Sequence, residues 1–364
     1  MPPATLFRYI TTQMILAVLV MFVVLTSLVI FVDLVESLRF VDKHQGGDLW
    51  FAVSLSLLRT PSVIQTMLPF VFLFGAIWLF HELNRRAELA VMRSAGLSVW
   101  RLLAPAALVA VLVGALVITV ADPLSTHFLS QSEKMRDKLT GGTSSVVRIF
   151  GDGIWLRQRD ANHVLLINAK SYDVARAALS HVVVWRLDEN AAFVERIDAP
   201  EAVLSGRTIE LKQARIKGAA DRLDRRSPIY AVATELTPAD LGERVESPET
   251  LSLWRLPKFI ALAEVAGLPT TRYSIRLHDL CSTPLKLVAM VLIAAMFSLR
   301  PVRSGAVIQL FLLAVVAGFL LYMLSEISTA LGESGTAPVT LAAWAPAVIA
   351  TLAAVTGLLH LEEG

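Results

Sequence analysis

Long apolar runs separated by polar loops occupy both ends of the chain. A helix needs about twenty apolar residues to cross the hydrocarbon of a bilayer. Six runs meet or approach this length, at residues 13–32, 51–80, 102–121, 284–299, 307–324 and 341–359. The first exceeds the core of a signal peptide, about 7–15 residues, and no A-x-A cleavage site follows it. The pattern predicts six membrane-spanning helices, which places both termini on one side.

Residues 144–236 follow a different pattern. Short stretches rich in β-branched residues alternate there with turn residues. This spacing is typical of an antiparallel sheet, either a sandwich or a curled sheet. Within the stretch 209–216 the apolar parity changes between Leu211 and Ala214, which predicts a β-bulge near Lys212 and Gln213. Residues 253–266 then have the pattern of an amphipathic helix that ends at Gly267.

The predicted fold is an α-helical membrane protein with six transmembrane helices and an inserted all-β domain. We divide the chain into a first membrane block at residues 1–121, a β domain with a return helix at 122–272, and a second membrane block at 273–364. Each membrane block holds three helices, and the first also holds a polar surface helix at 82–96.

Composition supports a membrane protein. The 364 residues are 55% apolar and 18% charged, whereas a soluble domain has about 25% charged residues. An ordinary soluble enzyme is therefore excluded. The net charge of +2 is too small to indicate a nucleic-acid partner. The single cysteine, Cys281, excludes an internal disulfide and a cysteine-cluster metal site.

The distribution of Lys and Arg predicts the orientation. The loop after the second run carries Arg85, Arg86, Arg93 and Arg101, whereas the loop 325–339 carries neither Lys nor Arg. Short loops rich in these residues remain in the cytoplasm. We therefore expect a multi-pass inner-membrane protein with cytoplasmic termini and a periplasmic β domain.

The helix predicted at residues 82–96 is basic and free of proline, and Gly96 is suited to end it. A helical wheel puts Leu83, Ala87, Ala90, Val91 and Ser94 on one face and Glu88 on the opposite face. Of the first face, we expect Leu83, Ala87 and Ala90 to pack on the membrane helices. The wheel also puts Arg85 and Met92 on the Glu88 face.

Two interpretations of this helix stay open. One is a solvated helix with an exposed Arg85–Glu88 ion pair. The other is a coupling helix that inserts Glu88 and Met92 into a partner, because Met is common at adaptable binding surfaces. The chain contains no G-x-x-x-x-G-K-[S/T] phosphate loop, so we expect no ATP site of that kind in it.

The run Glu88-Leu-Ala-Val-Met-Arg-Ser-Ala-Gly96 resembles the coupling-helix signature of the lipopolysaccharide export permeases, the LptF/LptG (YjgP/YjgQ) family. Arg8-Tyr9-Ile10 before the first run and Pro284-Leu285 in the fourth also resemble that family. Phe31-Val-Asp33 is more like its LptG branch than its LptF branch. The resemblance covers nearly the whole chain, in the family's order and spacing.

The resemblance implies a non-enzymatic permease subunit with a periplasmic β-jellyroll and no cofactor of its own. It implies an LptF-like permease as the heterodimer partner and an LptB-like ATPase dimer that uses ATP. An LptC-like bitopic protein and a periplasmic bridge would receive the lipopolysaccharide. The ATPase-coupling residues it implies are Arg85, Glu88, Met92, Arg93 and Gly96.

The phosphates of lipid A require cations near the outer rim of a binding cavity. The candidates are Arg39, Lys43, Arg59, Lys134, Arg136, Lys138, Arg272 and Arg276. Arg59 lies within an apolar run, which indicates either a functional site or a side chain that reaches to the interface. Ile30 stands where many LptG proteins carry a basic residue, so that contact is not carried over.

Three alternatives remain. One is that the chain is the LptF paralogue. Another is that it is a lipoprotein-release or mechanotransmission permease, a class that usually has four spans and its large domain between the first two. A membrane enzyme acting on a lipid headgroup is the third, but it would need an acid, base or metal cluster that the sequence does not display.

Overall fold

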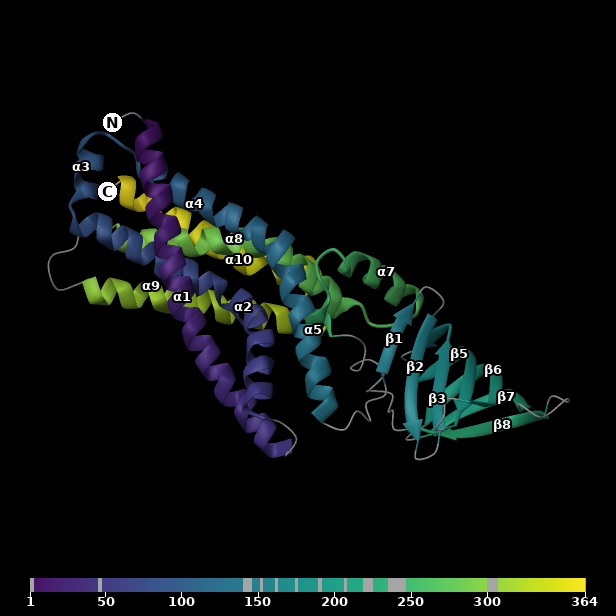
Figure 1. Cartoon of the computed structure of the whole chain (residues 1–364). Helices are drawn as coiled ribbons and strands as arrows, with labels where there is room; N and C mark the ends of the chain where they lie inside the picture. The colour runs from purple at the N-terminus through teal and green to yellow at the C-terminus, as the bar shows by residue number, and fades with distance from the viewer. Residues whose placement is uncertain are drawn as a thin grey trace. The chain divides into compact units, whose positions relative to one another are not determined.

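A computed structural model describes the chain as two compact units, Met1–Ser132 with Ile275–Gly364, and Glu133–Ser274 (Figure 1). The residues described are 3–44, 48–139, 146–150, 153–160, 163–173, 176–188, 192–205, 208–218, 225–234, 247–299 and 307–363.

The first unit is helical. Its elements are α1 (Pro3–His44), α2 (Leu49–Arg85), α3 (Glu88–Ser94), α4 (Val99–Leu116), a π-helical segment (Val117–Ala121), most of α5 (Asp122–Leu139), most of α8 (Thr271–Ser298), α9 (Val307–Glu333) and α10 (Val339–Glu363). In the part of the chain that the structure describes, six stretches of helix are long and apolar enough to cross a membrane, which confirms the six predicted spans.

The helix of the third span does not end where the polar residues begin. α4, the π-helical segment and α5 follow one another without a loop as far as Leu139. The proposed boundary between residues 121 and 122 therefore falls inside a helix. Asp122 is fully buried and Ser125 donates a hydrogen bond of 2.7 Å to Oε1 of Gln65 on α2. These polar residues stay within the bundle because other helices supply their partners.

α8 occupies the core of the helical unit, where its residues Ala289–Ala295 are buried. Gly114 on α4 lies against it: a Cβ atom there would be 2.6 Å from the Cα of Pro284. Small residues permit such close contacts between membrane helices, which apolar burial alone does not stabilise.

The second unit contains an eight-stranded antiparallel sheet. Its strands are β1 (Val146–Phe150), β2 (Gly153–Asp160), β3 (His163–Ala169), β4 (Ser171–Asp173), β5 (Ala178–Leu187), β6 (Phe193–Ser205), β7 (Thr208–Gly218) and β8 (Arg225–Ala233). The order is β1-β2-β3-β5-β6-β7-β8, and β4 pairs with β5. A short 3-10 helix (Pro248–Thr250) and α7 (Leu256–Val265) follow the sheet.

The sheet curls until strands from opposite ends of its order meet. Thr234, which follows β8, donates a 2.8 Å hydrogen bond to Oε1 of Gln158 on β2. The amide of Gln158 donates to the carbonyl oxygen of Ala233 at 3.2 Å. Curling encloses one apolar face, which includes Ile167, Val184 and Leu211. The inserted all-β domain is confirmed, and its strands form the curled antiparallel sheet rather than the sandwich.

The predicted change of parity in β7 is confirmed, but the bulge predicted to cause it is wrong. Gln213 has a φ of +51°, yet β6 and β7 keep the same register on both sides of it, at Asp198–Arg215 and at Glu201–Lys212. Ile209, Leu211, Ala214 and Ile216 all face the apolar interior because the backbone turns at Gln213. The predicted end of the following helix is also confirmed, since α7 ends at Val265 and Gly267 has a φ of +73°.

Candidate functional site

The loop between α2 and α4 forms the predicted surface helix, but in two parts. α2 continues to Arg85, and the separate helix α3 begins at Glu88. The expectation of one helix at 82–96 is wrong, because Ala87 between them has a φ of +56°. The left-handed conformation costs an alanine about 1–2 kcal/mol.

The burial of two leucines accounts for this break. Leu83 and Leu89 are both buried. In a continuous helix, six residues at 100° each would place them about 120° apart around the axis. The turn at Ala87 lets both pack on the same core. At its other end α3 is followed by Gly96, which has a φ of +79°. This confirms the prediction that Gly96 ends the helix.

The face of α3 that carries Glu88 points toward the bundle. The hydroxyl of Tyr9 on α1 donates to both carboxylate oxygens of Glu88, at 3.2 and 3.0 Å (Oε1 and Oε2). Met92 packs against the hydrophobic core, whereas Ala90 is exposed. The helical-wheel orientation was therefore wrong, since the buried Leu89 determines which face of so short a helix turns inward.

The predicted ion pair of Arg85 is replaced by a different one. Nη2 of Arg85 lies 3.1 Å from Oε1 of Glu82, and Nε of Arg86 lies 2.8 Å from the same oxygen. The hydrogen bond to Glu82 raises the pKa of Arg86 above its usual value. Arg93 is exposed on α3. The carboxylate of Glu88 accepts hydrogen bonds from Tyr9 instead, and Glu82 neutralises part of the charge of the basic loop.

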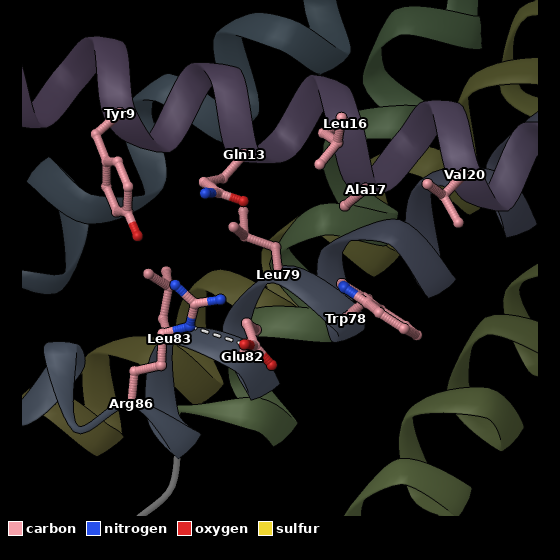
Figure 2. A pocket seen from close by; sticks show the side chains of 10 residues that line it. All are labelled: Tyr9, Gln13, Leu16, Ala17, Val20, Trp78, Leu79, Glu82, Leu83 and Arg86. Carbon is pink, nitrogen blue, oxygen red and sulfur yellow. Dashed lines mark hydrogen bonds and ion pairs between the residues drawn. The ribbon is translucent and has the colours of Figure 1, made fainter.

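A cavity of about 120 Å³ lies between α1 and α2 beside this cluster. Figure 2 shows Tyr9 and Gln13 on α1, and Trp78, Glu82 and Arg86 from α2 and the turn after it, lining the cavity. The remaining lining residues are Leu16, Ala17, Val20, Leu79 and Leu83. Apart from the polar groups near Tyr9, the wall is apolar.

The two chain ends lie at the same end of the helical unit as α3 (Figure 1). The backbone N–H of Val99, the first residue of α4, donates to Oε1 of Glu362 on α10 at 3.3 Å. A carboxylate at the start of a helix satisfies free N–H groups and complements the helix dipole. Side chains of α1 and α10 thus contact the segment of α3 and the start of α4.

Arg59 and Arg276, two of the candidate substrate cations, lie beside carboxylates. Nη1 of Arg59 on α2 lies 3.2 Å from Glu36 and 3.5 Å from Asp33, both on α1. Nη2 of Arg276 on α8 lies 3.3 Å from Oδ1 of Asp122 on α5. Arg59 therefore joins two helices rather than only reaching to an interface. Both cations are partly neutralised in this chain, which weakens the case for direct contact with a phosphate.

The other candidates fall in both units. Arg39 and Lys43 are exposed near the end of α1 in the helical unit. Lys134 and Arg272 are exposed in the second unit, and Arg136 is half-buried there. The side chain of Lys138 lies outside the described residues.

Sequence reasoning missed the partners of these groups. It named Tyr9 only within the Arg8-Tyr9-Ile10 motif and gave it no partner. It assigned no partner to Asp122 either, and it did not identify the pair of Asp279 and Lys286, which are joined within α8. The available signal was an ionisable residue inside or beside an apolar run, which indicates a specific partner in a membrane protein. Identifying that partner requires the rotation of each helix.

The model of one protein family, described as "Lipopolysaccharide export system permease LptF/LptG", matches residues 8–360. The chain belongs to this family. It is 26% identical over 336 residues to the lipopolysaccharide export system permease protein LptG of Haemophilus influenzae, covering 89% of each chain. It is 23% identical over 309 residues to the LptG of Escherichia coli K12, covering 80% of this chain and 81% of that one.

Membership of the LptF/LptG family has direct consequences. The family consists of permeases and not of enzymes. With six apolar helices, the chain is a multi-pass inner-membrane protein. The sheet follows the third membrane-spanning helix and precedes the other three. Lipoprotein-release and mechanotransmission permeases were expected to have four spans instead, with the large domain between the first two.

Proposed function

We propose that this chain is the LptG-type subunit of an ATP-driven lipopolysaccharide exporter. The observation that carries the proposal is the family match over residues 8–360, on a chain with six spans and an inserted β unit. Both relatives described above are LptG proteins, which favours LptG over LptF. The partner permease is then an LptF-like chain.

The proposed site of ATPase docking is α3, which includes Arg93, together with Arg85 at the end of α2. Two left-handed residues bound this helix, so it can move as a body separate from α2 and α4. Its outward surface includes Val91, whose exposed fraction is 67%. An exposed aliphatic side chain beside exposed arginines suits a groove on a partner. An LptB-like ATPase dimer would occupy this face and supply the energy of ATP hydrolysis.

In the proposed orientation α3 and both termini are cytoplasmic and the β unit is periplasmic. The excess of arginine in the loop around α3 supports this orientation. Lipopolysaccharide would leave the inner membrane and pass through the β units to an LptC-like protein and a periplasmic bridge. Arg39, Lys43, Lys134, Arg136, Lys138 and Arg272 are proposed to meet its phosphates.

The test is reconstitution. The chain is purified with the subunits that accompany it, placed in liposomes with lipopolysaccharide, and supplied with the bridge proteins and ATP. Lipopolysaccharide should move to the bridge only when ATP is hydrolysed. A complex that retains the LptF-like and LptB-like subunits but transports a different lipid, or transports without ATP, contradicts the proposal.

A further inference from the structure

α1 is a single helix of 42 residues, about 63 Å long at 1.5 Å per residue. Its buried residues fall in two groups, Ile10, Met14 and Ala17 near its start, and Asp33, Ser37 and Val41 near its end. Between them the helix carries exposed apolar residues such as Leu19, Val23 and Leu28. The described contacts of α1 with the rest of this chain are therefore strongest near its two ends.

A polar linkage joins α1 to another helix in each of these regions. In the first, Tyr9 donates to the carboxylate of Glu88 on α3, which we call the inner linkage. In the second, Asp33 and Glu36 pair with Arg59 on α2, which we call the outer linkage. Twenty-three residues of α1 lie between Tyr9 of the inner linkage and Asp33 of the outer linkage.

The inner linkage joins α1 and α3, two helices that are not consecutive in the chain. The chain itself connects α3 to α2 through Ala87 and to α4 through Gly96, and both of these residues have positive φ. α1 has no such connection to α3. The hydrogen bond of the Tyr9 hydroxyl is a direct polar link between them, and it is part-buried, so water competes less with it.

We propose that Tyr9 is a positioning residue that transmits displacement of α3 to α1, and through α1 to the outer linkage. This inference rests on the proposed function, because the displacement of α3 is attributed there to an ATPase. A hydrogen bond to a carboxylate is stronger than one between neutral groups. A rigid helix carries motion at one end to the other, so α1 moves Asp33 and Glu36 against Arg59.

The proposal predicts a loss of coupling without a loss of assembly. Tyr9→Phe removes only the hydroxyl and keeps the ring. In the reconstituted complex the subunits should stay together and ATP hydrolysis should continue. The lipopolysaccharide moved per ATP should fall about tenfold, the ratio that corresponds to losing a hydrogen bond to a charged group.

Three further variants test the linkage. Glu88→Gln keeps an acceptor oxygen and should restore most of the transport per ATP that Glu88→Ala loses. The double variant Tyr9→Phe with Glu88→Ala should be no worse than the poorer single variant, because both remove one bond. Thr12→Val is the matched control, since among the described residues the Thr12 hydroxyl donates to carbonyls of α1 itself, those of Arg8 and Tyr9.

Two results overturn the linkage while the proposed function stands. One is wild-type transport per ATP in Tyr9→Phe. The other is a double variant whose loss equals the product of the two single losses. Absence of ATP-dependent lipopolysaccharide transport by the wild-type complex contradicts the proposed function instead, so the two failures are distinguishable.

Discussion

Nη2 of Arg276 lies 3.3 Å from Oδ1 of Asp122, and the Asp122 side chain is fully buried. This pair joins α8 to α5 directly after the π-helical segment. Removing one partner of a buried ion pair leaves a charge without compensation, which costs about 3–5 kcal/mol. We expect Arg276→Ala to lower the free energy of unfolding by up to that amount, seen as a lower melting temperature in detergent.

The control for Arg276 is another arginine of the helical unit. Arg85→Ala removes an exposed pair with Glu82, in which 70% of the Arg85 side chain is accessible. Exposed pairs contribute little to stability, so its melting temperature should stay close to that of the wild type. Equal melting temperatures for Arg276→Ala and Arg85→Ala would show that Asp122 does not need Arg276.

Gly114 should tolerate no larger residue. A Cβ atom there would lie 2.6 Å from the Cα of Pro284, which cannot move without moving α8. Gly114→Val should therefore destabilise the protein by at least the overpacking cost of about 1–3 kcal/mol. Ala115→Val, at the exposed neighbouring position, should have almost no effect. Thermal unfolding in detergent measures both, and similar values would refute the close helix contact.

The outward surface of α3 should determine ATPase retention. Val91→Asp places a charge on the exposed apolar residue of the proposed docking face, where desolvating it is unfavourable. We expect the purified complex to lose its ATPase subunit and its ATP hydrolysis together. Val265→Asp on α7, where the native valine is also exposed, is the control. Full retention of the ATPase by Val91→Asp would place the docking face elsewhere.

The orientation can be tested with an impermeant thiol reagent in intact spheroplasts. With Cys281 replaced by serine, Arg176→Cys in the β unit should be labelled, because 82% of the Arg176 side chain is accessible. Val91→Cys on α3 should be labelled only after lysis, because we place α3 in the cytoplasm. Labelling of Val91→Cys alone in intact cells would reverse the assignment.

The cations of α5 supply a test of substrate contact. Reversing the charges of Lys134, Arg136 and Lys138 together should reduce crosslinking to lipopolysaccharide about tenfold, as expected when hydrogen bonds to a charged phosphate are lost. Reversal at Arg176, an exposed arginine of the same unit, is the control. Crosslinking that survives the triple reversal in an intact complex would show that these charges only solvate the helix.

Much of the architecture follows from local sequence. Six apolar runs are long enough to cross a bilayer wherever they occur, so six spans could be predicted without any tertiary contact. The alternation of apolar residues likewise predicted the inserted sheet and the change of parity near Lys212 and Gln213. Gly96 was recognised because glycine adopts the left-handed conformation at little cost.

The candidate site depended on contacts that no local pattern contains. The wheel pointed Glu88 outward, yet burial of Leu83 and Leu89 breaks the helix at Ala87 and turns Glu88 toward Tyr9. The sequence around Arg59 and Arg276 does not indicate their partners. The fold brings Glu36 beside Arg59 and Asp122 beside Arg276, in each case from another helix.

The amino-acid sequence by itself determined which segments leave water, because burial of apolar side chains is roughly additive along the chain. Only the tertiary structure decided which charges neutralise each other and which face of α3 remains exposed. Those outcomes depend on the rotation and register of helices separated by many residues, where a shift of one residue turns a side chain by about 100°.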